Sequence, residues 1–185
     1  MAANPPAFCA RQLVKRPMDY FTREQARQDI AALGLPQIIV DAFESNPLPY
    51  HLDIRFREPY QIFSMGLKGQ AAYGQGRITP VWTGGGDYTI VAYHHAPMRK
   101  GFFRFSIESP GVEHQPVGLG WQQILVHEFK CLWEQEWPDE RLREVAGWFN
   151  FKHIDLLITE LGHTRLDTFE KDSFWYQAFL DRIRD

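Results

Sequence analysis

Histidine and acidic side chains in this chain could bind a metal if the fold gathered them. His51 and Asp53 stand two residues apart, so on a strand they would share a face and could ligate a metal with a third group. His94 and His95 are adjacent, so on a strand they would point to opposite faces and could not easily share an ion. We favour a solvated polar strand face for His51 and Asp53, and we predict no metal site.

Other patterns that carry chemistry are incomplete. The pair His127-Glu128 lacks the second histidine four residues on that a zinc protease helix needs. The run Gly84-Gly85-Gly86 lies between two strand patterns with no Lys-Ser or Lys-Thr after it, which indicates a hairpin turn and not a phosphate loop. No Gly-x-Ser-x-Gly motif occurs. We therefore predict no catalytic residue and no cofactor.

The two cysteines do not form a metal-ligand pattern. Cys9 and Cys131 are far apart in the sequence, which excludes a disulfide scaffold and is typical of a reducing compartment. Cys131 lies in an apolar helical stripe, so we expect a small core residue and not a reactive thiolate. One alternative stays open: an enzyme whose site is assembled from scattered residues such as His51, Asp53, His94 and Arg104.

The amino-terminal part is predicted to be helical after a loose arm over residues 1–18. Thr22 and Gln25 have the spacing of a capping box, which predicts a helix from about Arg23 that Gly34 ends. Pro36 then opens a second short helix that ends before Pro47.

The middle of the chain is predicted to form an antiparallel meander. Alternation of apolar and polar residues indicates strands at 50–57, 60–65, 78–82, 88–94 and 102–108. The connections between them are too short for helical crossovers, so consecutive strands must pair antiparallel.

The carboxy-terminal third is predicted to be helical. Apolar residues recur every three or four positions over 121–133, and Pro138 starts a helix as its first residue. Two more helices are expected at 153–161, ended by Gly162, and at 173–183, with Phe174 on the apolar side. The prediction is a single α+β domain over residues 19–185, with amino-terminal helices, a central meander, and carboxy-terminal helices packed on the sheet; a helical extension begins near 138.

Composition narrows the class of protein. Hydrophobic residues make up 44% and charged residues 23% of the chain, which is typical of a globular domain. A net charge of −3 disfavours a nucleic-acid binder. The start of the chain resembles no signal peptide, and no apolar run is long enough to span a membrane. We expect a cytoplasmic protein without nucleic-acid or membrane partners.

Charge is unevenly distributed along the chain. Residues 108–144 contain 8 acidic and 3 basic residues, whereas residues 1–107 contain 8 acidic and 12 basic residues. The acidic positions Glu134, Glu136, Asp139 and Glu140 cluster at a predicted helix junction. Such a cluster could meet a basic partner surface, where charge complementarity raises the association rate, or it could simply be solvated.

The order of several motifs resembles the SUKH superfamily, which contains bacterial immunity proteins and relatives of fungal cell-wall synthesis regulators. The motifs are Leu33-Gly34-Leu35-Pro36 before a short helix, Pro80-Val81-Trp82, Gly85 to Tyr93, and Gly101 to Glu108. The resemblance covers roughly Thr22 to Trp133.

The resemblance implies a non-catalytic protein that binds and neutralises a cognate protein toxin in the cytoplasm of the producing cell. A regulatory or scaffold protein that binds a host partner is the other alternative. Aromatic residues and arginine dominate the binding energy of interfaces. Our candidates for partner binding, each of which could instead be a packed or solvated residue, are Trp82, Asp87, Tyr88, Tyr93, Arg104, Glu134, Glu136, Asp139 and Glu140.

Overall fold

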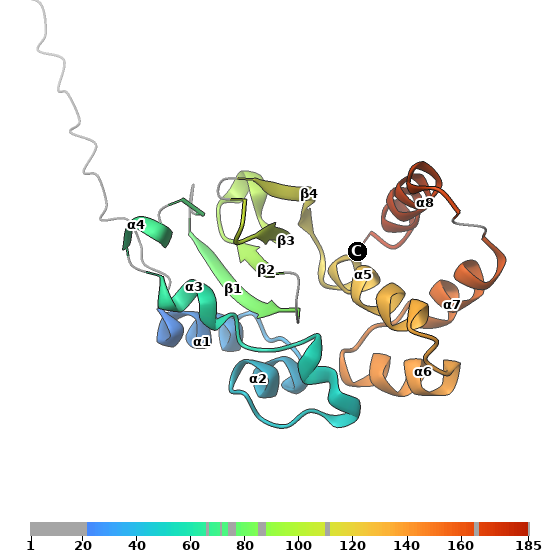
Figure 1. The fold of residues 1–185 in the computed structure, drawn as a ribbon, viewed down its shortest axis with the longest axis horizontal. Helices are drawn as coiled ribbons and strands as arrows, with labels where there is room; N and C mark the ends of the chain where they lie inside the picture. The colour runs from blue at the N-terminus through green and yellow to red at the C-terminus, as the bar shows by residue number, and fades with distance from the viewer. Residues whose placement is uncertain are drawn as a thin grey trace, which may run out of the picture.

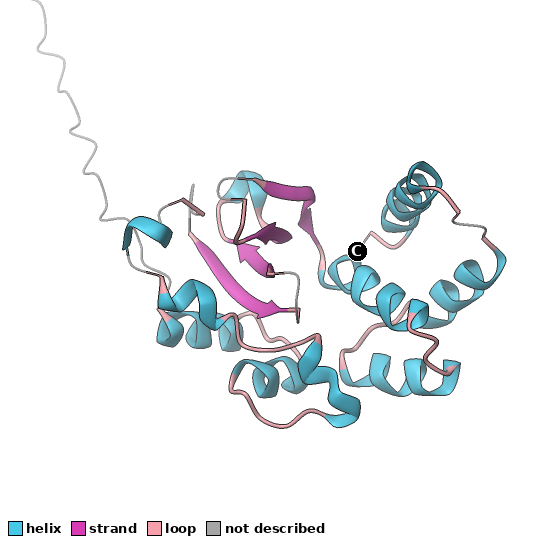
Figure 2. Cartoon of the chain, in the orientation of Figure 1, coloured by secondary structure: helices cyan, strands magenta, loops and turns pink. Residues whose placement is uncertain are grey.

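The computed structural model describes residues 22–65, 67–70, 72–73, 77–84, 88–109, 112–164 and 167–184. Figure 1 shows an antiparallel sheet with the amino-terminal helices beside it and the carboxy-terminal helices gathered at the other end of the molecule. Figure 2 shows the same division between helices and strands. The predicted α+β class is confirmed. The expected arm over residues 1–18 lies outside the described residues.

The two amino-terminal helices form where the capping and stop signals predict them. Helix α1 spans Arg23–Ala32, and the Gln25 backbone N–H donates to the hydroxyl of Thr22 at 3.1 Å. Gly34 follows α1 with a φ of 64°, a left-handed conformation that suits glycine. Helix α2 spans Gln37–Phe43 and begins directly after Pro36.

Two predicted strands are helical in the structure, so these predictions were wrong. Residues Pro49–Ile54 form the 3₁₀ helix η1, and Tyr60–Ser64 form the short helix α3, with α4 over Leu67–Gln70 after it. The apolar residues buried around η1 are Leu48, Leu52 and Phe56. Their four-residue spacing is that of a helical face, whereas Ile54, which completes the alternating pattern, is exposed.

Four strands form the sheet in the order β1-β2-β3-β4. The strands are β1 (Ile78–Thr83), β2 (Thr89–His94), β3 (Gly101–Ser106) and β4 (Glu113–Leu119), with the 3₁₀ helix η2 (Pro97–Arg99) before β3. The antiparallel meander is confirmed for consecutive pairs. Sequence reasoning missed β4, because it is an edge strand that contains Pro116, and proline weakens a strand pattern.

Both faces of the sheet are covered. On one face Val81, Val91 and Phe102 belong to the main core with α1, α2 and the carboxy-terminal helices. On the other face the smaller core consists of Ile62, Ile78, Ile90, Ala92, Phe103 and Phe105. Because the sheet is covered on both faces, every residue of β1 is buried. Burial along β1 is therefore continuous, whereas a strand with one exposed face would alternate between buried and exposed residues.

The carboxy-terminal helices are present where predicted, with shifted ends. They are α5 (Trp121–Glu134), α6 (Asp139–Trp148), α7 (Ile154–His163) and α8 (Phe169–Arg182). Pro138 caps α6 and does not form its first turn, and α7 continues through Gly162. Helix α8 starts four residues early because the Thr168 hydroxyl accepts from the Lys171 N–H. Phe174 is exposed, in contrast to the prediction.

We predict that Trp82→Ala lowers the free energy of unfolding by about 3–5 kcal/mol, because the ring is fully enclosed and its removal leaves a cavity. Trp82 is 1% exposed and packs against two further aromatic rings, those of Phe56 and Trp121. Its Nε1 is buried with no acceptor among the described residues, so Trp82→Phe should cost less than Trp82→Ala. Chemical denaturation measures both, and an unchanged midpoint in Trp82→Ala would contradict the assignment.

Candidate functional site

The sheet residues that the sequence singled out lie in different environments. Trp82 is enclosed in the core and presents no ring surface to a partner. Tyr93 is half-buried, with the edge of its ring against Phe102. Tyr88 is 49% exposed and has a φ of 51°, while Asp87 lies outside the described residues. Of these four positions, Tyr88 is the one that the structure places at the surface.

Arg104 belongs to a buried ion cluster between the sheet and α5. Its Nη2 donates to Oε1 of Glu128 at 3.1 Å and to the carbonyl oxygen of Ile124 at 2.6 Å. Nη1 of Arg55 donates to the other oxygen, Oε2, of the same Glu128 at 3.1 Å. One carboxylate on α5 therefore ties together β3 and the residue that follows η1. Arg104 stabilises the interior and is not presented as a surface contact.

The charges of this cluster determine the protonation of the residues around it. Burial alone would raise the pKa of Glu128, but the charges of Arg104 and Arg55 and the hydrogen bond from Arg104 contribute in the opposite direction, and the pKa is held below its ordinary value. Burial, followed by the charge of Arg104, lowers the pKa of His127 to about 4. Burial also raises the pKa of Cys131, whose Sγ lies 3.7 Å from His127 Nε2. At neutral pH the imidazole and the thiol are both uncharged, so they do not form a thiolate–imidazolium pair.

The scattered residues considered for an enzyme are not gathered at one place. His94 is buried with its ring against Phe103, which belongs to the smaller core on one face of the sheet. Arg104 contacts α5 on the other face. His51 and Asp53 are exposed on η1, which is helical, so they do not share a strand face as expected. The sheet itself therefore separates His94 from Arg104.

The four predicted acidic residues stand together at the surface. Glu134 ends α5, Glu136 lies in the connection, and Asp139 and Glu140 begin α6; all four are exposed. Between residues 134 and 144 the chain has five carboxylates and two arginines. We call Glu134, Glu136, Asp139 and Glu140 the acidic junction. Asp139 and Glu140 lie in the first turn of α6, where the helix dipole favours negative charge, whereas Glu134 ends α5 and pairs with Lys130.

Glu136 has an unusual backbone conformation within the acidic junction. Its φ is 59°, and its N–H donates to the carbonyl oxygen of Trp133 at 2.9 Å. The next N–H, of Trp137, donates to the carbonyl oxygen of Leu132 at 3.3 Å. These two hydrogen bonds form a Schellman motif, in which glycine usually occupies the left-handed position. The chain therefore holds a carboxylate at the surface at a position where glycine would be less strained.

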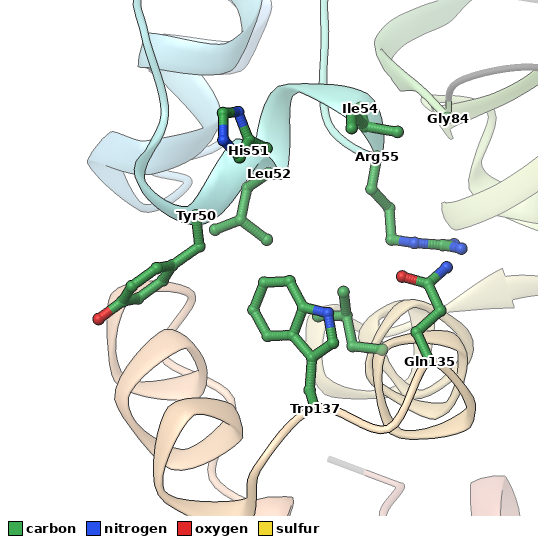
Figure 3. A pocket seen from close by; sticks show the side chains of 9 residues that line it. Tyr50, His51, Leu52, Ile54, Arg55, Gly84, Gln135 and Trp137 are labelled. Carbon is green, nitrogen blue, oxygen red and sulfur yellow. The ribbon is translucent and has the colours of Figure 1, made fainter.

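A pocket of about 300 Å³ opens next to the acidic junction, between η1 and the α5–α6 connection. Figure 3 shows the side chains that line it, with Trp137 at its base and Arg55 and Gln135 together at one end. The lining residues are Tyr50, His51, Leu52, Ile54, Arg55, Gly84, Leu132, Gln135 and Trp137. Arg55 thus links the buried ion cluster to the pocket.

Aromatic rings and an arginine surround the mouth of the pocket. The rings of Tyr50 and Trp137 meet edge to face, with their centres 6.2 Å apart. The guanidinium of Arg141 lies 4.8 Å from the ring centre of Tyr50 and 5.4 Å from that of Trp137. The Tyr50 hydroxyl donates to Glu144 at 2.8 Å. Tyr50 and His51 both have a positive φ, 54° and 57°. Strained backbone of this kind is concentrated at functional sites.

Sequence reasoning missed most of this site. Arg55 and Glu128 are 73 residues apart, so no local spacing pointed to their contact. Glu128 was considered only as part of an incomplete zinc motif. The aromatic positions Tyr50 and Trp137 carry no distinguishing pattern in a chain with 27 aromatic residues in total, 6 Trp, 7 Tyr and 14 Phe. The acidic junction was the one part of the site that a local charge pattern could indicate.

Comparisons of the chain with protein-family models, with curated proteins and with solved structures find no match in any of the three. Among the described residues, no three histidine, cysteine or acidic side chains lie together as a metal site would require. Within the same part of the chain, no helix has both the length and the apolar character needed to cross a membrane.

Acid should destabilise the fold between pH 6.5 and 4 through His127. The unfolded imidazole binds a proton near its ordinary pKa of 6.5, whereas the folded one binds it only near pH 4. Stability present above pH 6.5 is therefore lost as the pH falls toward 4, by about 3 kcal/mol. Urea denaturation across this range measures the loss, and His127→Gln, which cannot titrate, should lose correspondingly less. Equal losses in the two proteins would contradict this prediction.

Replacing Glu136 with glycine should raise the free energy of unfolding by about 0.5–1 kcal/mol. Glycine removes the steric cost of the left-handed conformation, while its greater freedom in the unfolded chain offsets part of the gain. Glu136→Ala is the matched control, because it removes the carboxylate and keeps the strain. A gain in stability in both variants would point to charge repulsion in the acidic junction and not to backbone strain.

Proposed function

We propose that this protein is an immunity protein that binds a cognate bacterial toxin by direct protein–protein contact. The observation that carries the proposal is the exposed acidic junction, which lies next to the aromatic side chains Tyr50 and Trp137. Aromatic anchors with a charged rim are typical of protein interfaces. The partner surface should accordingly be basic.

The resemblance to the SUKH superfamily is our reason for proposing a toxin, and not another kind of protein, as the partner. In that resemblance the domain acts by binding and contributes no shared catalytic residues. The protein would act in the cytoplasm of the producing cell, where its net charge of −3 suits neither nucleic acid nor an anionic membrane surface.

A binding mechanism places physical demands on the interface. A stable complex buries about 1,200–2,000 Å² in total, so the contact must extend well beyond the pocket mouth. The acidic junction would accelerate the encounter with a basic surface, while Tyr50 and Trp137 would supply desolvated contact area. Tyr50 is already held by Trp137, Trp148 and Glu144, so little side-chain freedom is lost when it binds.

The test of this function is co-expression with the product of the adjacent candidate toxin gene, followed by size-exclusion chromatography. Rescue of growth together with a co-eluting complex is the expected result. Rescue without any complex would indicate an enzyme that reverses the product of the toxin, and the binding proposal would be wrong.

Charge reversal tests the surface. Changing all four residues of the acidic junction to lysine should slow association by about tenfold or more and weaken its dependence on salt, because steering by complementary charge is lost. The matched control changes four other exposed acidic residues to lysine, namely Glu24, Glu108, Glu170 and Asp181, and so produces the same net charge. If the two variants slow association equally, overall charge and not the acidic junction governs binding.

A further inference from the structure

The ion cluster beneath the pocket contains more positive than negative charge. Arg55 and Arg104 share Glu128, and the side chains of these three residues are 23%, 11% and 5% exposed. Burial keeps the His127 imidazole and the Cys131 thiol uncharged at neutral pH through their shifted pKa values. The cluster therefore has a surplus of one positive charge in a poorly solvated place.

The cluster also has more hydrogen-bond donors than acceptors. Nε of Arg104 is buried and has no acceptor among the described residues. Arg55 donates to Glu128 through Nη1 and also interacts with Cys131, and a guanidinium has five N–H groups, so its fork has further donors. Groups of this kind favour an anion that can accept several hydrogen bonds.

Arg55 is the member of the cluster that reaches the pocket. Figure 3 shows its guanidinium beside the amide of Gln135, with the indole nitrogen of Trp137 turned toward both. Among the described residues that line the pocket there is one positive side chain, Arg55, and no aspartate or glutamate. This end of the pocket is therefore complementary to a negative charge.

The rest of the pocket is complementary to a flat apolar group. The ring of Trp137 forms its base, and the apolar side chains of Leu52 and Leu132 also line it. The pocket volume of about 300 Å³ is at the lower end of the range for small-molecule sites, so the pocket can hold only a small molecule. A single negative charge matches the single surplus positive charge, whereas a phosphate dianion would exceed it.

We propose that this pocket binds a small aromatic carboxylate, with the carboxylate against Arg55 and Gln135 and the ring against Trp137. This binding site shares Trp137 with the protein–protein contact proposed above, but it does not depend on the presence of a toxin. The carboxylate would neutralise the surplus positive charge at Arg55, and its ring would exclude water from the pocket.

The test is a titration of the full chain with benzoate, followed by the ¹H–¹⁵N spectrum of the indole N–H groups. The Trp137 signal is assigned from the spectrum of Trp137→Phe, and the other five tryptophans are internal controls. Benzoate should shift the Trp137 signal in a saturable manner. Benzamide, which has the same ring without the charge, and inorganic phosphate should each bind at least tenfold more weakly. Equal affinity for benzoate and benzamide, or equal shifts of all indole signals, would overturn the proposal.

Three variants separate binding from folding. Arg55→Met should weaken benzoate binding at least tenfold, while Glu128 keeps Arg104 as its partner. Gln135 is exposed, so Gln135→Met should fold normally and weaken binding several-fold. Glu128→Gln increases the surplus positive charge and should tighten benzoate binding even though it lowers stability. Arg143→Met, which removes an exposed arginine away from the pocket lining, is the matched control and should leave binding unchanged. Tighter binding in Gln135→Met, or weaker binding in folded Glu128→Gln, would overturn the proposal.

Discussion

The carboxylate of Glu128 holds three parts of the molecule together. It lies on α5 and accepts from Arg104 on β3 and from Arg55 after η1, one arginine to each oxygen. A buried ion pair is costly to desolvate, and losing one partner leaves an uncompensated charge in the interior. The Glu128 side chain therefore fixes α5 against the sheet and also fixes the segment after η1 against α5.

Packing around this cluster explains the layout of the rest of the fold. The face of the sheet that carries Arg104 also carries Val91 and Phe102, and it is covered by helices from both ends of the chain. The opposite face requires its own cover, which Ile62 of α3 provides. A second set of polar contacts holds α1 against β1, where Asp29 accepts from Arg77 at 2.5 Å and from Thr79 at 2.7 Å. The carboxylates of Glu128 and Asp29 thus each join a helix to a strand distant in the sequence, through Arg104 of β3 and Thr79 of β1.

The surface to which we assign the proposed function lies where these layers meet. The pocket opens between η1 and the α5–α6 connection, so its shape depends on how Arg55 and Glu128 position the two segments. The acidic junction is outside the cluster and faces solvent, so the proposed steering of a partner and the proposed ligand site use different charged groups. Strained backbone at Tyr50, His51 and Glu136 surrounds the same opening. A rigid interior thus supports a surface on which charge and aromatic area lie close together.

The sequence by itself determined the elements whose signals are local. The Thr22 cap and Gly34 indicated α1, the periodicity over 121–133 indicated α5, and short connections required an antiparallel meander. The acidic junction was also visible, because its four carboxylates are neighbours in the chain. Only the tertiary structure decided that residues 49–54 and 60–64 are helical. In the first segment the apolar residues fit both the two-residue period of a strand and the four-residue spacing of a helical face. Burial of Leu52 and Phe56, with Ile54 exposed, selects the helical spacing. Only the tertiary structure brought Arg55 to Glu128, because a contact across 73 residues depends on how the layers pack and leaves no mark in local spacing.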